Sequence, residues 1–311
     1  MTDNPIEPHS YYNEFRERFD GIFPPLEEEV RRDEIGGLDL IVERLDTFKR
    51  AIKHPKMYEI YGVRPPRGFL LSGPPGCGKT YIAKYLSKEL KARFVDIPLS
   101  KYESKWVGES SKTLTEYIDL CRGYYEVFNT PVLLFFDEGE EAFKDRNLEG
   151  WHGPRVNVLL REMDGLSGDN SGLYFGAATN HKAKIDRAAT RPGRLDFHID
   201  FPEYTMAALA DVFRATMIRL NRKSKFKPFF LSDNEYNILG GRAYIEGFTP
   251  AHINELFSRA TNMKIKELCD NNKKIVKKSD CAVGFEEILY QMDNYESLDS
   301  KVTSDIGFST R

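Results

Sequence analysis

The chain has 311 residues, of which 41% are hydrophobic and 30% charged, and its formal net charge is −3. This composition is typical of a soluble globular protein with one large domain or two smaller ones, and the charge gives no argument for binding nucleic acid or an acidic membrane. The four cysteines show neither a CxxC pair nor a Cys/His metal spacing, which favours a reducing, cytoplasmic location. We expect no secretory signal and no transmembrane segment, because no apolar run is long enough.

Residues 1–32 mix charged and aromatic side chains around Pro24-Pro25 and contain one short predicted helix near Tyr11–Phe19. This segment is too short for a domain, so we predict an arm or linker. From 33 to 203, short apolar runs alternate with amphipathic stretches, which predicts an α/β domain with buried parallel strands. The predicted strands are Phe69–Leu71, Phe94–Ile97, Val132–Phe136, Leu173–Phe175 and Phe197–Phe201.

From about residue 204 the strand signals stop and helical patterns follow. We therefore predict a small all-helical domain over 204–295 and a polar tail over 296–311. Pro250 suits the first turn of a helix, where its missing N–H is not needed. The predicted helices are Met206–Leu220, Asp233–Gly240, Pro250–Leu268 and Phe285–Met292.

Residues 73–80 read GPPGCGKT and match the pattern G-x-x-x-x-G-K-[ST]. They follow a predicted strand and precede a predicted helix, Tyr81–Leu90, which is the context that a phosphate-binding P-loop requires. Lys79 would reach the β- and γ-phosphates, and the Thr80 hydroxyl would bind Mg²⁺. The predicted nucleotide-binding residues of this loop are Pro75, Gly76, Cys77, Gly78, Lys79, Thr80 and Tyr81.

Polar residues follow the next predicted strands. Asp137 would hold the Mg²⁺ shell and Glu138 would polarise the attacking water. Asn180 either orients that water or is an ordinary turn residue. Arg191 and Arg194 flank a Pro-Gly turn, so both can project from one loop. They either stabilise the transition-state charge of a neighbouring site or form surface salt bridges.

In order and spacing, eight motifs of this chain resemble the classical clade of AAA ATPases, the AAA+ subgroup that includes katanin, spastin and the membrane-protein extractors. The resemblance runs from about Asp33 to about Met292. The motifs are DEIGGL (33–38), GPPGCGKT (73–80), SKWVGES (104–110), LLFFDE (133–138), REMDGL (161–166), AATN (177–180), TRPGRLD (190–196) and GFTPAHI (247–253).

The resemblance implies a P-loop α/β domain (33–203), a small helical lid domain (204–295) and a hexameric ring with ATP at each subunit interface. Asn180 matches sensor 1, Arg191 and Arg194 match the arginine fingers, and 163–165 matches a segment that signals between subunits. The resemblance places Ile35, Gly36 and Gly37 by the adenine, and Pro250 and Ala251 near the nucleotide.

The chain departs from the family pattern at three places. Gly139-Glu140 replaces the usual Ile-Asp, Pro250 replaces a glycine, and 181–184 replaces a regular Arg-Pro pair. None of these changes removes a catalytic group, so we still expect hydrolysis by a divergent member.

The segment Lys105-Trp106-Val107-Gly108 matches the aromatic–hydrophobic–glycine pore loop, which in such rings lines the axial channel and grips a polypeptide. An isolated tryptophan is more often packed against the core, but the resemblance favours a channel-facing Trp106. Residues 151–152, Trp-His, fall where a second pore loop would lie, although a packed Trp151 is an equal alternative.

The leading hypothesis is a Mg²⁺-dependent ATPase that forms a homo-oligomer and remodels an unidentified protein substrate, with or without an adaptor. One alternative is an ATP-gated scaffold with low turnover, against which Glu138 and Asn180 argue. A nucleic-acid motor is a weaker alternative, because acidic residues interrupt the lysines near the predicted pore loop. A fused zinc protease is not expected, because HExxH is absent.

Overall fold

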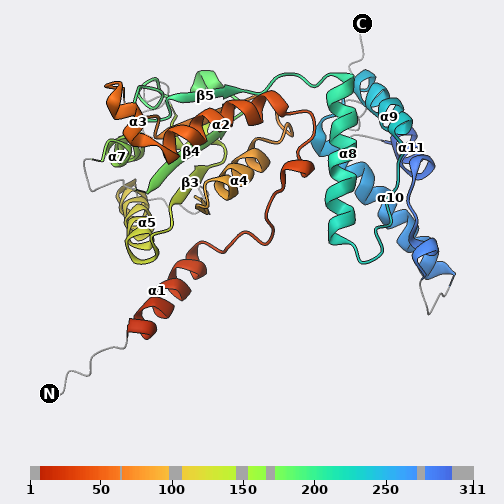
Figure 1. Cartoon of the computed structure of the whole chain (residues 1–311), viewed down its shortest axis with the longest axis horizontal. Helices are drawn as coiled ribbons and strands as arrows, with labels where there is room; N and C mark the ends of the chain where they lie inside the picture. Colours follow the sequence, from red (N-terminus) through yellow and green to blue (C-terminus); the bar gives the residue numbers. More distant parts are fainter. Residues whose placement is uncertain are drawn as a thin grey trace, which may run out of the picture. The chain divides into compact units, whose positions relative to one another are not determined.

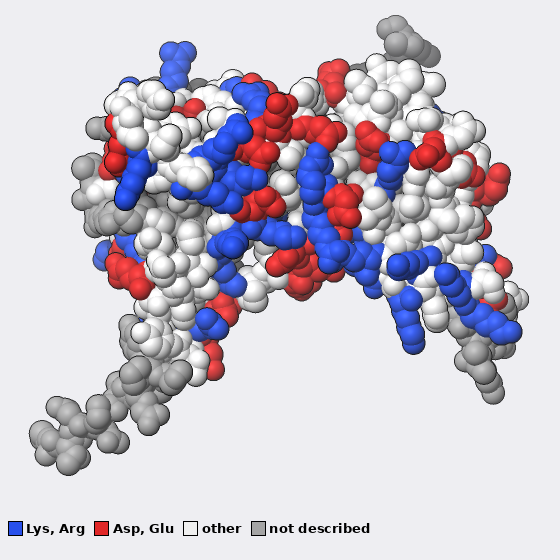
Figure 2. Space-filling model, in the orientation of Figure 1, with Lys and Arg blue, Asp and Glu red and all other residues white. Residues whose placement is uncertain are grey.

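The computed structural model describes residues 8–63, 65–97, 107–144, 153–165, 172–271 and 277–295. These residues form two compact units: 8–32 joins 39–202 in the first, and 33–38 joins 203–295 in the second (Figure 1). On the face drawn in Figure 2, acidic and basic side chains are interspersed over both units.

The first unit is built on a five-stranded parallel sheet in the order β2-β3-β4-β1-β5. Strands β1 and β3 are buried along their whole length, as expected of a sheet with helices on both faces. All five predicted strands are therefore confirmed, and so is the α/β fold. The strands are β1 (Gly68–Ser72), β2 (Arg93–Asp96), β3 (Val132–Phe136), β4 (Leu173–Thr179) and β5 (Phe197–Asp200).

The helices of this unit precede β1 or lie between its strands. They are α1 (Pro8–Ile22), α2 (Asp39–Lys53), α3 (Pro55–Ile60), α4 (Lys79–Glu89), α5 (Val107–Phe128), α6 (Gly139–Ala142) and α7 (Gly153–Met163), with the 3₁₀ turns η1 (Arg32–Glu34) and η3 (Lys182–Lys184). The main core of the unit lies between the sheet and helices α1, α5 and α7. Glu138 and Asn180 directly follow the carboxyl ends of β3 and β4, whereas Arg191 and Arg194 precede the amino end of β5.

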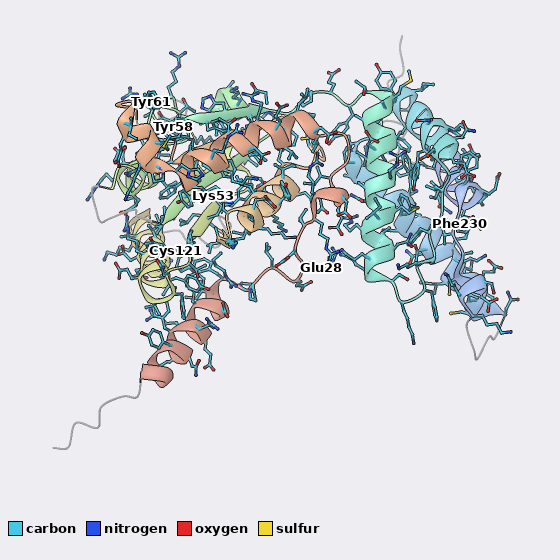
Figure 3. The ribbon with its side chains drawn as sticks, in the orientation of Figure 1. Glu28, Lys53, Tyr58, Tyr61, Cys121 and Phe230 are labelled. Atoms are coloured by element: carbon cyan, nitrogen blue, oxygen red, sulfur yellow. The ribbon has the colours of Figure 1, made fainter. Side chains whose placement is uncertain are left out.

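Helix α1 belongs to this core, although we predicted an arm over 1–32. Phe19 is fully buried, and its ring centroid lies 4.2 Å from that of Tyr124 on α5. The Phe23 ring packs edge-on against Tyr117 at 5.1 Å. Cys121, labelled on α5 in Figure 3, is buried in the same core. The aromatic residues of α1 recur every four positions and so share one helical face, which gives the segment a docking surface that its length alone did not reveal.

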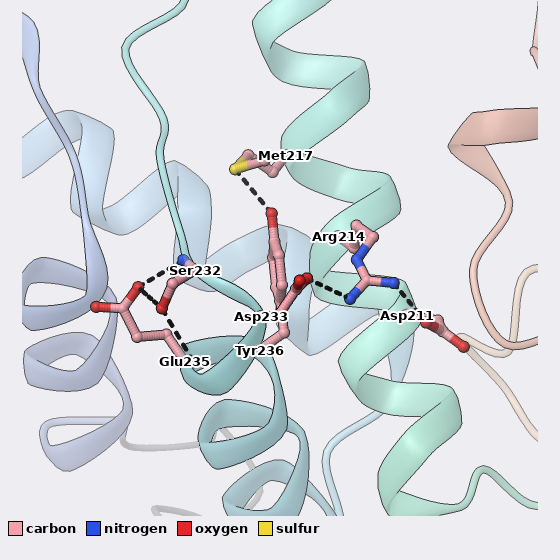
Figure 4. Close-up of polar contacts among 7 residues, drawn as sticks. All are labelled: Asp211, Arg214, Met217, Ser232, Asp233, Glu235 and Tyr236. Carbon is pink, nitrogen blue, oxygen red and sulfur yellow. Dashed lines mark hydrogen bonds and ion pairs between the residues drawn. The ribbon is translucent and has the colours of Figure 1, made fainter.

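The second unit is helical. Its elements are α8 (Met206–Lys223), α9 (Asp233–Ile245), α10 (Pro250–Asp270), the 3₁₀ turn η4 (Lys278–Cys281) and α11 (Phe285–Asp293). All four predicted helices are present and start at the predicted residues. The start of α9 is fixed by a capping box between Ser232 and Glu235, drawn in Figure 4. In the same view Arg214 of α8 pairs with Asp233, which joins the two helices.

Residues 33–38 pack on α8, whereas we expected them to begin the large domain. A Cβ on Gly36 would lie 2.2 Å from the Asp211 carbonyl oxygen. Gly37 has φ of +70°, and a Cβ on it would lie 2.6 Å from the Ala208 carbonyl oxygen. Glu34 is buried and pairs with Arg222. Both glycines are therefore required by the close approach of this segment to the helix.

Candidate active site

The P-loop connects β1 to α4, and glycine makes its path possible. Gly76 and Gly78 have φ of +72° and +93°, in the region that disfavours any side chain. A Cβ on Gly73 would lie 2.7 Å from the Cβ of Phe201. The loop leads into the N-terminus of α4, whose free N–H groups and dipole favour an anionic phosphate.

Lys79 is the centre of the site's hydrogen bonds and is only 8% exposed. Its Nζ donates to the carbonyl oxygens of Gly73 at 2.9 Å and Pro74 at 2.8 Å, and to the Asn180 Oδ1 at 2.7 Å. Asn180 follows β4, which is the neighbour of β1 in the sheet. The structure therefore brings the sensor candidate to the P-loop lysine, although the two are 101 positions apart.

Thr80 and Asp137 form the candidate magnesium site. Thr80 lies in the first turn of α4, and Asp137 directly follows β3. The Thr80 hydroxyl donates to the Asp137 Oδ2 at 2.8 Å. A hydroxyl and a carboxylate are oxygen ligands of the kind that Mg²⁺ prefers beside phosphates. The two residues present therefore fit the ion.

Glu138 has an unusual backbone. Its φ of 55° and ψ of 49° are left-handed, a conformation that costs a non-glycine residue free energy and that is concentrated at functional sites. Its side chain is exposed, so it is accessible to a water at the phosphates. At the next residue, Gly139, a Cβ would lie 3.0 Å from the Cβ of Ala177, so this chain leaves little room there for a side chain. Glu140 is buried, and its Oε2 has no hydrogen-bond partner among the described residues.

Two groups near the site have shifted pKa values. Burial raises the pKa of the Cys77 thiol, although the nearby Lys79 charge opposes the shift, so the thiol is protonated and poorly nucleophilic at neutral pH. Burial also raises the pKa of Asp96, and the negative charge of Asp137 adds to the effect. Sequence reasoning missed Asp96, even though an acidic residue at the end of the β2 run was visible.

The two arginine candidates differ in their contacts. Arg191 is exposed, and none of the described residues forms a hydrogen bond or ion pair with its side chain. Arg194 donates to both carboxylate oxygens of Asp164, from Nε at 2.9 Å and Nη2 at 2.7 Å. This hydrogen-bonded pair lowers the pKa of Asp164 and raises the pKa of Arg194. The salt-bridge alternative raised by the sequence therefore describes Arg194 in this structure.

The departure at 181–184 forms another contact that the sequence did not indicate. Lys182 donates to Asp200 at 2.7 Å, and the Ser72 hydroxyl donates to the same carboxylate oxygen. Lys182 lies shortly after β4, Asp200 ends β5 and Ser72 ends β1. Because these three strands are adjacent in the sheet, the network joins their carboxyl ends beside the P-loop. The Lys182 hydrogen bond is the main reason why the pKa of Asp200 is lowered.

The remaining candidates lie elsewhere. Lys105 and Trp106 fall outside the described residues, as do Trp151 and His152, and Val107 and Gly108 are the first residues of α5. In the second unit, Pro250 and Ala251 begin α10, where the Thr249 N–H donates to the His252 Nδ1 at 2.9 Å. Ile35, Gly36 and Gly37 also belong to this second unit.

Comparisons with known proteins agree with these assignments of fold. Residues 69–203 match the model of the ATPase family associated with various cellular activities (AAA). The chain is 40% identical over 179 residues to an uncharacterized AAA domain-containing protein of Schizosaccharomyces pombe, which covers 56% of this chain and 22% of that protein.

Two further relatives have functional names. The chain is 36% identical over 201 residues to the proteasome-activating nucleotidase of Thermococcus onnurineus, covering 62% of this chain and 49% of that protein. It is 34% identical over 243 residues to a cell division cycle protein 48 homolog of Archaeoglobus fulgidus, and this match covers 77% of this chain and 31% of that protein. The match therefore spans less than half the length of these relatives. No described helix combines the length and the apolar character needed to cross a membrane.

Proposed function

Since the chain is an AAA-family ATPase, we propose that it hydrolyses ATP with Mg²⁺ as a ring of identical subunits and uses the cycle to remodel protein substrates. The observation that carries this proposal is the cluster at the strand ends, where Lys79 contacts Asn180 and Thr80 contacts Asp137. Such a cluster contains the groups that phosphoryl transfer to water requires.

Each residue of the cluster has a role in this proposal. Lys79 exchanges its carbonyl partners for phosphate oxygens, while Asn180 stays within reach of the γ-phosphate. Thr80 and Asp137 would hold Mg²⁺, which would supply positive charge against the charge that develops on the phosphates. Glu138 orients the attacking water and accepts its proton at a carboxylate oxygen. These roles depend on positioning and electrostatics, which supply most of the catalysis in this class of reaction.

An arginine from a neighbouring subunit completes the proposed site. The exposed side chain of Arg191 supports this assignment. Residues Lys105–Gly108 lead into α5, so the proposed pore loop is connected directly to a helix of the ATPase core. One relative is named a proteasome-activating nucleotidase, and this name supports the proposal that the chain acts on a protein substrate. None of the four cysteines, all of which lie among the described residues, forms a disulfide, which agrees with the proposed reducing, cytoplasmic location.

The test is the ATPase rate per subunit as a function of protein concentration with Mg²⁺ present. A steep rise to a plateau is expected, because an active site shared between subunits forms only on assembly. A substantial rate that stays flat down to concentrations at which the protein is shown to be monomeric would reject the ring. The Lys79→Ala protein serves as the inactive control, because it loses the charge that binds the phosphates.

A further inference from the structure

The second unit carries a row of exposed lysines where helix α8 ends. Residues 222–227 read RKSKFK, and Lys223, Lys225 and Lys227 are exposed, whereas the residues between them are half-buried. Ser224 has extended backbone angles, with φ of −85° and ψ of 139°. Because alternate residues of an extended segment face the same side, the three lysines are presented together to solvent.

A second chain segment adds two lysines at the same end of the unit. Phe229 forms a parallel bridge with Val283, and the Val283 N–H donates to the Pro228 carbonyl oxygen at 3.0 Å. This bridge holds the loop after α8 beside the segment that contains η4. Lys277 and Lys278, at the start of η4, are both exposed. On the face drawn in Figure 2, basic side chains gather at this end of the second unit and project outward.

Three acidic side chains near this end already have partners. Glu34 is buried and pairs with Arg222. Glu267 pairs at 2.9 Å with a lysine one turn earlier on α10, and Asp280 accepts from the Lys277 N–H at 3.0 Å. The formal net charge of −3 for the whole chain therefore conceals a local excess of positive charge, which the composition did not reveal.

The backbone of Lys227 is strained. Its φ of +49° lies in the left-handed region, which costs a residue with a side chain free energy and is concentrated at functional sites. A glycine at this position would relieve the strain but would remove the charge. The chain thus carries a lysine here at an energetic cost, which points to a use for its charge.

An exposed aromatic ring follows the lysines in the chain. Phe230, labelled in Figure 3, is 59% exposed and lies three residues after Lys227. Its ring is held against Gly284, where a Cβ would lie 3.0 Å from it. Lysines attract anionic headgroups, and a phenylalanine ring enters the boundary between headgroups and acyl chains. The two kinds of side chain together are typical of a surface that binds an anionic bilayer.

We propose that this basic end of the second unit docks on the surface of an anionic membrane. Its members are Lys223, Lys225, Lys227, Lys277, Lys278 and Phe230. The lysines come from two segments and project outward, which suits a flat layer of headgroups, whereas single-stranded nucleic acid is bound along a groove. Lysine also lacks the planar fork with which arginine recognises individual carboxylates. The inference goes beyond the proposed function and requires no ATP hydrolysis.

Co-sedimentation of the full-length protein with lipid vesicles, without nucleotide, tests the proposal. The vesicles contain about one part phosphatidylserine to two parts phosphatidylcholine, and vesicles of phosphatidylcholine alone are the reference. We expect binding to the anionic vesicles only, and its loss at about 0.5 M salt, where charges are screened within a few ångströms. The triple variant Lys223→Gln, Lys225→Gln, Lys227→Gln should bind about 100-fold more weakly, at about fivefold per lysine. Phe230→Ser should weaken binding about tenfold, because less apolar area enters the interface.

A matched control removes the same charge from the first unit. The triple variant Lys53→Gln, Lys56→Gln, Lys91→Gln replaces three exposed lysines and should keep the parental affinity. Equal melting temperatures would show that both triple variants fold as the parent does. If the two variants weaken binding equally, only net charge matters and the assignment to the basic end fails.

Three other results would overturn the proposal. They are no binding to the anionic vesicles, equal binding to phosphatidylcholine alone, and binding of a single-stranded oligonucleotide or polyglutamate that the anionic vesicles do not displace. Because no nucleotide is present, each of these results leaves the proposed ATPase function untouched. An inactive ATPase would in turn leave the vesicle result intact, so failures of the two proposals are distinguishable.

Discussion

The packing of α1 on α5 predicts that Phe19 is essential for the stability of the first unit. Phe19 is fully buried and contacts the rings of Tyr124 and Phe23. Truncating a buried phenylalanine to alanine costs about 3–5 kcal/mol, because it removes apolar burial and leaves a cavity. For a unit of this size, about 2–4 °C of melting temperature is lost per kcal/mol, so Phe19→Ala should lower the transition by about 6–20 °C.

The assay is thermal unfolding followed by circular dichroism at matched protein concentrations. Tyr12→Ala is the control, because Tyr12 lies on the same helix and its ring centroid is 6.4 Å from that of Phe128 on α5, but its side chain is 44% exposed. Its effect should be clearly smaller than that of Phe19→Ala, because less apolar area is buried at this position. If Phe19→Ala lowers the melting temperature no more than Tyr12→Ala does, α1 is not part of the folded core and the arm interpretation is restored.

Four further predictions concern single residues. Glu138→Gln should bind ATP but stop turnover, as measured by nucleotide binding and phosphate release. Trp106→Ala should keep the parental ATPase rate and lose the unfolding of a tagged model protein. Ser232→Ala should destabilise the second unit by about 0.5–2 kcal/mol in urea titrations, since it removes a helix cap. Because the Arg194 hydrogen bond lowers the pKa of Asp164, the stability that this carboxylate contributes is present above its ordinary pKa of 3.8 and is lost as pH falls further. The melting-temperature difference between parent and Asp164→Asn should therefore stay constant from about pH 8 to about pH 5.

Helix starts were predictable because each carries a local chemical signal. Ser232 with Glu235 caps α9, and Pro250 opens α10. Helix ends were less predictable. We expected α9 to stop at Gly240, but the helix continues to Ile245. Gly240 faces α8, where a Cβ would lie 2.6 Å from the Ala210 nitrogen. This glycine permits close packing of two helices, and a single sequence does not distinguish that role from a helix stop.

The site was predictable in its components and not in its contacts. The P-loop pattern and the acidic strand end identify Lys79 and Asp137, because the spacing itself carries the chemistry. The Lys79–Asn180 contact depends on β4 lying beside β1. The order of strands in a parallel sheet is a property of the whole fold, so no local pattern encodes it. The Arg194–Asp164 pair has the same origin, since α7 and the loop after β4 meet only in the folded unit.

Gly36 and Gly37 have two possible roles, contact with the adenine or close packing on α8, and these roles need different experiments. The resemblance places them beside the adenine, whereas the structure shows that any side chain at Gly36 would collide with the Asp211 carbonyl oxygen at 2.2 Å. A Gly36→Ala variant would therefore disturb the attachment of 33–38 to α8, whether or not nucleotide is present. Lost ATPase activity in that variant would not identify an adenine contact. Ile35 is the better probe of the base, because Ile35→Val changes one methylene and leaves the glycine path intact.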